Sequence, residues 1–163
     1  MAISIDGLIT KGKNDSDWVS KTDWNQFYSY IQSNDAVIMG RKTMDAFGKD
    51  CPIADTFNIV LSNNKKLHKS GNNLAIMSAT PKKVVEFAKS KSLNNLLLIG
   101  GSETNKQFLK AKLIDEIVLS AHPLIIGNGL HLFDDDPLDV PLELIDTKTI
   151  NNELVQLKYK VVK

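Results

Sequence analysis

The chain alternates short β-rich runs with helical patterns, and this alternation constrains its fold more than any other feature. Apolar runs such as 36–39 are bounded by turn-forming residues, whereas Trp24, Phe27, Tyr28 and Ile31 recur at helical spacing. The pattern is typical of an α/β sheet with helices on its faces. It predicts about eight strands and three or four helices. The strands are expected at residues 2–5, 36–39, 56–61, 74–77, 95–99, 114–126, 142–147 and 154–162.

Composition restricts the classes of function that this chain can serve. Its 163 residues, 42% hydrophobic and 24% charged, suit one globular domain spanning residues 1–163. A net charge of +1 gives no global field for nucleic acid or anionic lipid. Apolar runs are far shorter than the roughly 20 residues that span a bilayer. Cys51 is the single cysteine, and the amino terminus lacks a signal-peptide pattern. We expect a cytoplasmic protein without nucleic-acid or membrane partners.

Two strand ends carry glycines that suit an anion site. Gly40-Arg41-Lys42-Thr43 follows one apolar run, and Gly100-Gly101-Ser102-Glu103-Thr104 follows another. Free N–H groups at a helix start favour phosphate, and two such anchors suit a dinucleotide. Arg41 is the single arginine, and its guanidinium fork suits phosphate. The alternatives are a solvated helix end at Arg41 and a tight strand-to-helix turn at the paired glycines.

A third strand end carries polar side chains in place of glycines. Leu61-Ser62-Asn63-Asn64-Lys65-Lys66 ends the strand with a hydroxyl, two amides and two cations. These groups could hold an adenosine ribose or its 2′-phosphate, and an exposed turn explains them equally well.

Asp23 is the main catalytic candidate. A carboxyl group near the start of an aromatic-flanked helix can be desolvated and serve as a proton donor or orienting group. Ser20-Lys21-Thr22-Asp23 also matches a capping box, so a purely structural role remains open. The histidines His68, His122 and His131 lack the spacing of a metal site and are expected to be structural or surface residues, so no metal is predicted.

Several motifs, taken in order, resemble those of the dihydrofolate reductase superfamily. They are Val37-Ile38-Met39-Gly40-Arg41-Lys42-Thr43, Asn58-Ile59-Val60-Leu61-Ser62 and Leu98-Ile99-Gly100-Gly101. Within it, Ser4-Ile5-Asp6-Gly7, Asp17-Trp18 and the segment from His122 to Phe133 look more like the RibD C-terminal reductase family. The resemblance implies a dihydrofolate-reductase-like α/β fold, with a central mixed sheet of about eight strands flanked by helices. NADPH would lie across the strand ends, and homodimers are frequent.

The resemblance also implies roles for individual residues. Gly40, Arg41, Lys42 and Thr43 would hold cofactor phosphates, and Leu61, Ser62 and Asn63 would surround the adenosine. The pyrophosphate would lie against Gly100, Gly101, Ser102, Glu103 and Thr104. Ala2 and Ile9 would lie against the nicotinamide. Asp23, Phe27 and Ser120 would face the substrate, and Asp6 is a further acidic candidate in that site.

The implied activity is an NADPH-dependent reductase acting on a small pyrimidine or pterin. Like the riboflavin-pathway enzyme, it would reduce 5-amino-6-(5-phosphoribosylamino)uracil; dihydrofolate or another pterin is the alternative substrate. A nucleotide-binding protein without turnover is an alternative of another class. Asn63, Thr10 and Asn105 depart from the folate enzymes, which weakens the case for folate more than for the cofactor. A separate zinc deaminase domain is not expected in 163 residues.

Overall fold

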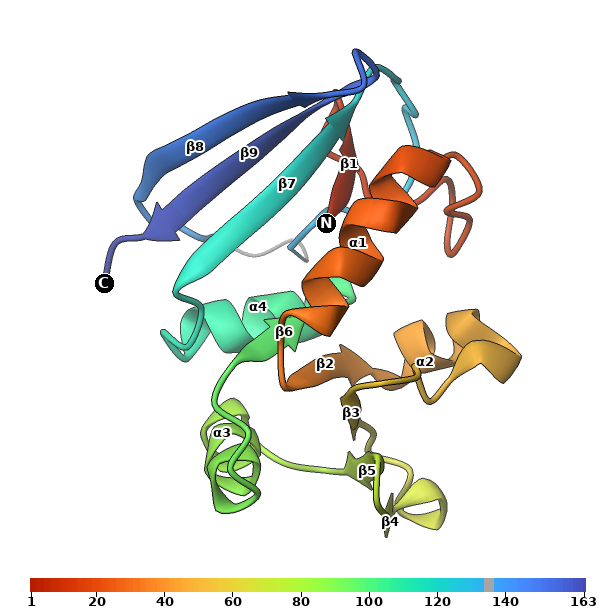
Figure 1. Ribbon diagram of the computed structural model, residues 1–163, viewed down its shortest axis with the longest axis vertical. Helices are drawn as coiled ribbons and strands as arrows, with labels where there is room; N and C mark the ends of the chain where they lie inside the picture. The colour runs from red at the N-terminus through yellow and green to blue at the C-terminus, as the bar shows by residue number, and fades with distance from the viewer. Residues whose placement is uncertain (134–136) are drawn as a thin grey trace. The chain divides into compact units, whose positions relative to one another are not determined.

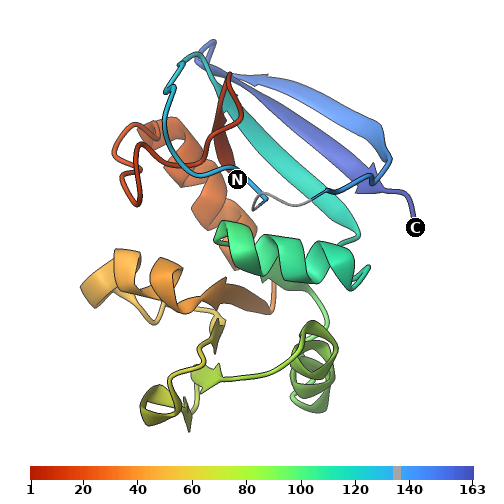
Figure 2. The same ribbon diagram turned by 180° about the vertical axis from the view of Figure 1, so that it is seen from behind.

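A computed structural model describes residues 1–133 and 137–163 and divides the chain into two compact units. We call residues 28–111 the middle unit and residues 1–27 with 112–163 the terminal unit. Figures 1 and 2 show the elements of both from opposite sides. One domain over residues 1–163 stays a prediction.

The middle unit is built on a mainly parallel five-stranded sheet with the order β4-β5-β3-β2-β6. Its strands are β2 (Ala36–Gly40), β3 (Phe57–Leu61), β4 (Lys69–Ser70), β5 (Leu74–Met77) and β6 (Leu96–Leu98). Only β4 pairs antiparallel, on the outer side of β5. Gly40 lies opposite Leu61, and Leu61 lies opposite Met77. The carboxyl ends of three parallel strands are therefore level at one edge of the sheet.

Three α-helices follow these strand ends. They are α2 (Arg41–Phe47), α3 (Pro81–Ser90) and α4 (Ser102–Lys110), with short 3₁₀ helices η1 (Gly48–Asp50) and η2 (Lys65–Leu67). Pro81 occupies the first turn of α3, as predicted, but the Thr80 side chain makes no capping hydrogen bond. Val84 and Ala88 are completely buried, because their four-residue spacing places both on one helix face.

The core of the middle unit is mainly apolar, and the most deeply buried of its polar side chains is the amide of Asn58. Strand β2 is buried from Ala36 to Met39, as expected for a parallel strand covered on both faces. Asn58, also fully buried, accepts from Ile53 N and donates to the Ile53 and Thr56 carbonyls at 2.9–3.0 Å. The loop before β3 is thereby fixed to the strand.

The terminal unit holds a four-stranded mixed sheet with the order β1-β7-β9-β8. Its strands are β1 (Ala2–Ser4), β7 (Glu116–His122), β8 (Leu142–Ile150) and β9 (Leu154–Val161), and α1 (Lys21–Gln32) begins in this unit. Strand β1 pairs parallel with β7, and the other two pairings are antiparallel. Ser4 lies opposite His122, so two segments distant in sequence supply one face of the sheet.

The predicted α/β fold with mixed sheets and flanking helices is confirmed, and the strand count requires correction. The described residues form nine strands in two sheets, not about eight in one. Strand β4 was missed because Lys69-Ser70 is too short and polar to give a β signal. Strand β7 ends just before Pro123, where a bend was expected. The expected loop over residues 130–141 lies partly outside the described residues.

No helix in the described part of the chain is long and apolar enough to cross a bilayer.

Candidate active site

Asp23 lies in the first turn of α1, and its surroundings separate a capping role from a chemical one. Its backbone N–H donates to Ser20 Oγ at 3.2 Å, which forms half of the expected capping box. The Ser20 N–H donates instead to His122 Nε2 at 3.3 Å. The carboxylate is therefore not used for reciprocal capping. Asp23 is only 6% exposed, and its Oδ2 lies 4.0 Å from His122 Nε2.

His122 is held in one orientation beside this carboxylate. Its Nδ1 lies 3.1 Å from the Ser120 carbonyl, and its Nε2 accepts from Ser20 N–H. A neutral ring with its hydrogen on Nδ1 satisfies both contacts. Trp18 packs edge-on against the imidazole at 5.1 Å between ring centroids. Its buried indole Nε1 has no hydrogen-bond partner among the described residues, so the ring that packs against His122 carries an unused donor.

The charge around Asp23 includes the amino group of Met1. This group donates to the Val118 carbonyl at 2.7 Å. Burial lowers the pKa of the Met1 amino group, and the nearby Asp23 carboxylate opposes that shift. The carboxylate thus lies in a desolvated environment where a nearby charge acts strongly.

Four other predicted residues lie in the terminal unit. Ala2 on β1 lies opposite Ser120 on β7, and Ser120 is buried with Gln156 Nε2 3.5 Å from its hydroxyl. Phe27 packs edge-on against Trp24 within α1. The Ile9 N–H donates to the Leu130 carbonyl at 2.7 Å. The roles of Ala2, Ile9, Phe27 and Ser120 toward a ligand stay predictions.

Asp6 anchors a loop. Its carboxylate accepts from the N–H groups of Ile126 and Gly127 at 2.7–3.3 Å. Hydrogen bonds from Ser4 and then from Gly127 and Ile126 lower the pKa of Asp6 to about 2. A substrate would have to share a carboxylate that already accepts three backbone contacts, so a positioning role suits Asp6 better than direct binding.

In the middle unit, the glycine-rich ends of β2 and β6 meet. The Gly40 N–H donates to the Gly100 carbonyl at 2.8 Å. A Cβ at Gly40 would lie 2.7 Å from Thr104 Oγ1, closer than atoms can pack. A Cβ at Gly101 would meet only Thr43 Oγ1, at an ordinary 3.6 Å. Gly40 is therefore required by packing, whereas Gly101 leaves backbone accessible to a ligand.

Two of the charged residues around these glycines, Arg41 and Glu103, already have partners. The Arg41 guanidinium pairs with Asp45 one turn further along α2. The Glu103 carboxylate is engaged by Lys106 at 3.0 Å and by Gln107 at 2.8 Å. A phosphate would have to displace Asp45 from Arg41, and Glu103 could contribute only its backbone N–H. Lys42 is exposed, Thr43 and Ser102 are half-buried and Thr104 is buried at the same strand ends.

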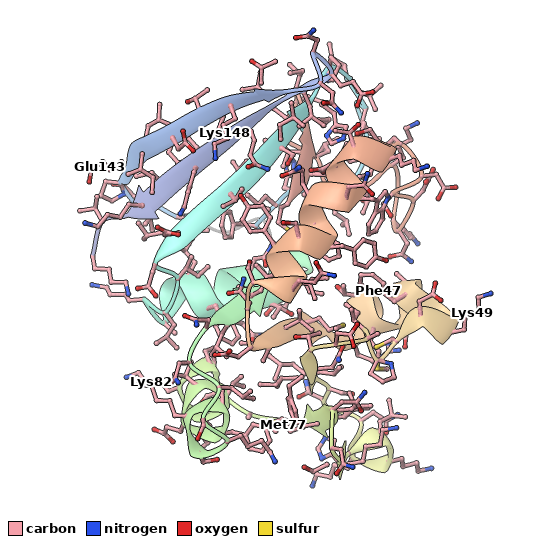
Figure 3. All side chains as sticks on the ribbon, viewed as in Figure 1. Phe47, Lys49, Met77, Lys82, Glu143 and Lys148 are labelled. Atoms are coloured by element: carbon pink, nitrogen blue, oxygen red, sulfur yellow. The ribbon has the colours of Figure 1, made fainter. Side chains whose placement is uncertain are left out.

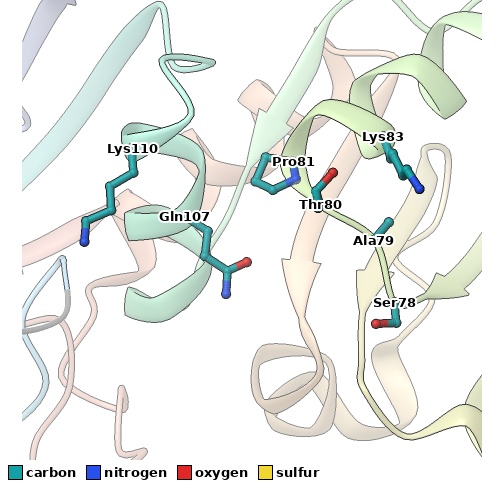
Figure 4. A pocket seen from close by; sticks show the side chains of 7 residues that line it. All are labelled: Ser78, Ala79, Thr80, Pro81, Lys83, Gln107 and Lys110. Carbon is teal, nitrogen blue, oxygen red and sulfur yellow. The ribbon is translucent and has the colours of Figure 1, made fainter.

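The end of β3 adjoins a surface cavity. Ser62 is buried, and its hydroxyl accepts from the Asn64 N–H, while Asn63 Oδ1 accepts from the Ser78 hydroxyl at 3.0 Å. Leu61 is half-buried opposite Met77. A cavity of about 590 Å³ opens beside Ser78 (Figure 4). It is lined by Ser78, Ala79, Thr80, Pro81, Lys83, Gln107 and Lys110, and the Gln107 amide points into it.

Sequence reasoning missed His122 as a neighbour of Asp23 and Trp18 as a neighbour of His122, and it missed the cavity residues. Period-two alternation places His122 on the same side of β7 as Ser120, so a signal for His122 was present. The structure places His122 in a buried position beside Asp23, and the expectation that it is a structural or surface residue stays a prediction. The cavity residues come from the start of α3 with the loop before it and from α4, and no local pattern links these segments. The described residues contain no cluster of three metal-binding side chains.

Comparison with known proteins identifies the family. The sequence profile of the RibD C-terminal domain matches residues 1–156. The chain belongs to the RibD C-terminal domain family. The uncharacterized protein YyaP of Bacillus subtilis is 25% identical over 171 residues, covering 98% of this chain and 91% of YyaP. The expected resemblance to RibD-type reductases is thereby confirmed.

Two solved structures show the same fold as this RibD C-terminal domain. A Thermotoga maritima diaminohydroxyphosphoribosylaminopyrimidine deaminase/5-amino-6-(5-phosphoribosylamino)uracil reductase is 16% identical, with a TM-score of 0.79 over 99% of this chain and 55% of that one. Dihydrofolate reductase from Enterococcus faecalis, complexed with NADP(H), is 17% identical. Its TM-score is 0.71 over 99% of this chain and 94% of the reductase. At these identities, the likeness concerns the fold.

Proposed function

We propose that this RibD C-terminal domain is an NADPH-dependent reductase of a small pyrimidine. The observation that carries the proposal is the meeting of Gly40, Gly100 and Gly101 at the carboxyl edge of a parallel sheet. Nucleotides bind at such strand ends, where helix starts present free N–H groups. Family membership supports the same reading.

Backbone groups and one cavity of the middle unit suit the cofactor. Accessible backbone at Gly101 and the first turn of α4 suit a pyrophosphate, because no side chain blocks the approach there. The cavity beside Asn63 and Ser78 offers hydroxyls, an amide and two lysines, which suit an adenosine with its 2′-phosphate. When bound, NADPH supplies a hydride.

The terminal unit supplies proton chemistry in this proposal. Asp23 holds or relays a proton to the substrate, because it is buried and free from reciprocal capping. The Ser120 carbonyl and the Ser20 N–H fix the His122 ring, whose Nε2 lies 4.0 Å from the Asp23 carboxylate. The indole N–H of Trp18 can position a substrate oxygen or a water beside them.

We favour 5-amino-6-(5-phosphoribosylamino)uracil as the substrate, with hydride delivered to the ribosyl C1. Membership of the RibD C-terminal domain family supports this choice, and the Thermotoga protein of the same fold bears that reductase name. Dihydrofolate or another pterin is the second candidate, because a buried carboxylate such as Asp23 can bind the amidine edge of a pterin. We also propose that the protein is cytoplasmic and forms a homodimer.

Oxidation of NADPH by the purified chain tests the function. The nicotinamide absorbance is followed with the pyrimidine and with dihydrofolate in separate reactions, and the products are identified by mass spectrometry. Turnover with the pyrimidine alone supports the proposal. Turnover with dihydrofolate alone would show that the substrate is a pterin and not the pyrimidine. Tight NADPH binding without turnover of either compound would establish the non-catalytic alternative, and absence of NADPH binding would refute the proposal.

A further inference from the structure

The first turn of α1 is capped by a side chain from another element. Ser20 precedes the helix, and its hydroxyl accepts from the Asp23 N–H at 3.2 Å. In a complete capping box, the Asp23 carboxylate would accept from the Ser20 N–H in return. His122 Nε2 accepts from that N–H instead, at 3.3 Å. The last residue of β7 thus takes the place that the local sequence offers to Asp23.

The surroundings of His122 favour one tautomer and one orientation of its ring. The residue is 4% exposed, and its Nδ1 lies 3.1 Å from the Ser120 carbonyl. A hydrogen on Nδ1 satisfies that carbonyl and leaves the Nε2 lone pair for the Ser20 N–H. Trp18 packs edge-on against the ring. The side chains that α1 and β7 carry are drawn on the ribbon in Figure 3.

The Asp23 carboxylate lies beside Nε2 without bonding to it. Its Oδ2 is 4.0 Å from His122 Nε2, which is beyond hydrogen-bond distance. Both atoms are acceptors while the ring is neutral, so no proton lies between them. The carboxylate is therefore engaged neither by the helix start nor by the imidazole, although Asp23 is only 6% exposed.

We propose that neutral His122 is a positioning residue, which keeps the Asp23 carboxylate available to the substrate by accepting the Ser20 N–H in its place. This role rests on the proposed function, in which Asp23 holds or relays the proton. Without the ring acceptor, the carboxylate turns back to the Ser20 N–H and completes the capping box. The helix then keeps its start, but Asp23 is withdrawn from the substrate.

Protonation of His122 withdraws the carboxylate by a second route. A hydrogen on Nε2 prevents the ring from accepting the Ser20 N–H, and the Asp23 carboxylate lies 4.0 Å from that nitrogen. A charge-assisted hydrogen bond then forms between the imidazolium and the carboxylate. A carboxylate beside a cation also resists protonation, so Asp23 loses its capacity to hold a proton for the substrate.

One further charged group bears on this pair. The Met1 amino group, just before β1, donates to the Val118 carbonyl and interacts with the Asp23 carboxylate. The neighbouring strands present uncharged groups to the end of β7. Ser4 lies opposite His122 on β1, and Gln156 lies opposite Ser120 on β9. Asp23 is therefore the charged group that responds to the state of the ring.

Two substitutions at His122 test the role in catalysis. His122→Gln reaches the position of Nε2 with an acceptor that does not titrate, and it should keep single-turnover hydride transfer within about threefold of the wild type. His122→Leu removes the acceptor and should lower that rate about tenfold. His131→Gln, at an exposed position in the same unit, is the matched control and should leave the rate unchanged.

The pH profile separates positioning from packing. As pH falls, the rate of the wild type relative to His122→Gln should decline over the range in which NMR shows the His122 ring taking up its proton. Equal losses in the Gln and Leu variants, with a rate ratio that does not change with pH, would overturn the proposal. If the Leu variant does not fold, the ratio of wild type to Gln variant still decides.

The Ser20 amide signal gives a readout that needs no activity. It should follow the titration of the His122 ring, which is one of three histidines in the chain. Asp23→Ala should move the signal little in the wild type and strongly in the His122→Leu background, where the carboxylate is the acceptor. A Ser20 signal that ignores the His122 titration would overturn the proposal. Turnover of no substrate together with the expected amide shifts would refute the proposed function and leave His122 as the capping group.

Discussion

The terminal unit and the middle unit build their candidate sites from different material. In the terminal unit, the side chain of Asp23 lies 4.0 Å from His122, and Trp18 packs edge-on against His122. In the middle unit, backbone groups at Gly40, Gly100 and Gly101 form the candidate site, and the nearby Arg41 and Glu103 already have partners. The proposed function assigns proton chemistry to the first unit and anion binding to the second.

The comparison has a consequence for mutation. A site of side chains fails when a functional group changes, even at constant size. A site of backbone fails when any side chain is added. The two kinds of variant should therefore separate chemistry from cofactor affinity.

The largest effect is expected at Asp23. Asp23→Asn keeps the size of the side chain but removes its acid–base capacity. It should lower single-turnover hydride transfer about 10²-fold or more while leaving NADPH affinity unchanged. Rapid-mixing absorbance and cofactor titration measure the two quantities. The loss should shrink at lower pH for a substrate that solvent can protonate.

Ser20→Ala is the matched control for Asp23→Asn. It removes the hydroxyl that accepts from the Asp23 N–H and should cost about 1 kcal/mol of stability, with little change in turnover. If both variants reduce turnover equally, Asp23 acts through the helix start and its catalytic assignment is wrong.

The second-largest effect is expected at Gly101, where the candidate site of the middle unit depends on accessible backbone. Gly101→Val should weaken NADPH binding at least about tenfold, because the added side chain occupies the space through which the ligand approaches the backbone. One charge-assisted contact alone contributes ~1.5–3 kcal/mol, so the loss of a single such contact accounts for an effect of this size. Its Cβ meets only Thr43 Oγ1 at 3.6 Å, so the fold should be retained by circular dichroism. Normal NADPH affinity in a folded variant would leave Gly101 as a turn residue only.

Gly40→Ala is the contrasting glycine variant. Its Cβ would lie 2.7 Å from Thr104 Oγ1, so it should lower the free energy of unfolding by about 1–3 kcal/mol. Thr104→Ala in the same chain removes the clash and should recover part of that loss in chemical denaturation.

The third effect concerns the Arg41–Asp45 pair. Arg41→Ala should weaken NADPH about tenfold and NADH far less, because only NADPH carries the extra phosphate. Asp45→Asn should act in the opposite direction, since it releases the guanidinium from its partner on α2. Calorimetric titration with both cofactors measures the four affinities. Equal losses for NADPH and NADH would remove Arg41 from phosphate recognition.

The smallest effect is expected at Asp6. Its folded pKa of about 2 lies below the ordinary value of 3.8, so its stabilisation is fully present above that ordinary value. It is lost as pH falls through about 2. The melting temperature of Asp6→Asn should therefore lie below that of the wild type at neutral pH, and the difference should vanish in strong acid. A pH-independent difference would contradict the anchoring role of the Asp6 carboxylate.

Most local elements could be predicted because their signals are local. The run from Ala36 to Met39 is a buried strand, and the Ser20 cap starts a helix as expected. The missed β4 has only two polar residues, and its pairing depends on β5. The division of nine strands between two sheets depends on pairings between distant segments, which periodicity does not report.

Features of the candidate site could likewise be predicted where their signals are local, and not where they depend on contacts between distant residues. The order of most strands and helices, the glycines at two strand ends and the family of the chain could be predicted, because each depends on contiguous residues. Folding was needed to show that the Ser20 N–H donates to His122, so that the Asp23 carboxylate does not accept it. Folding was also needed to show that Asp45 pairs with Arg41 and that β8 lies at an edge of its sheet. Partner choice among hydrogen-bonding and charged groups depends on which groups come within reach after folding, and spacing along the chain does not specify that.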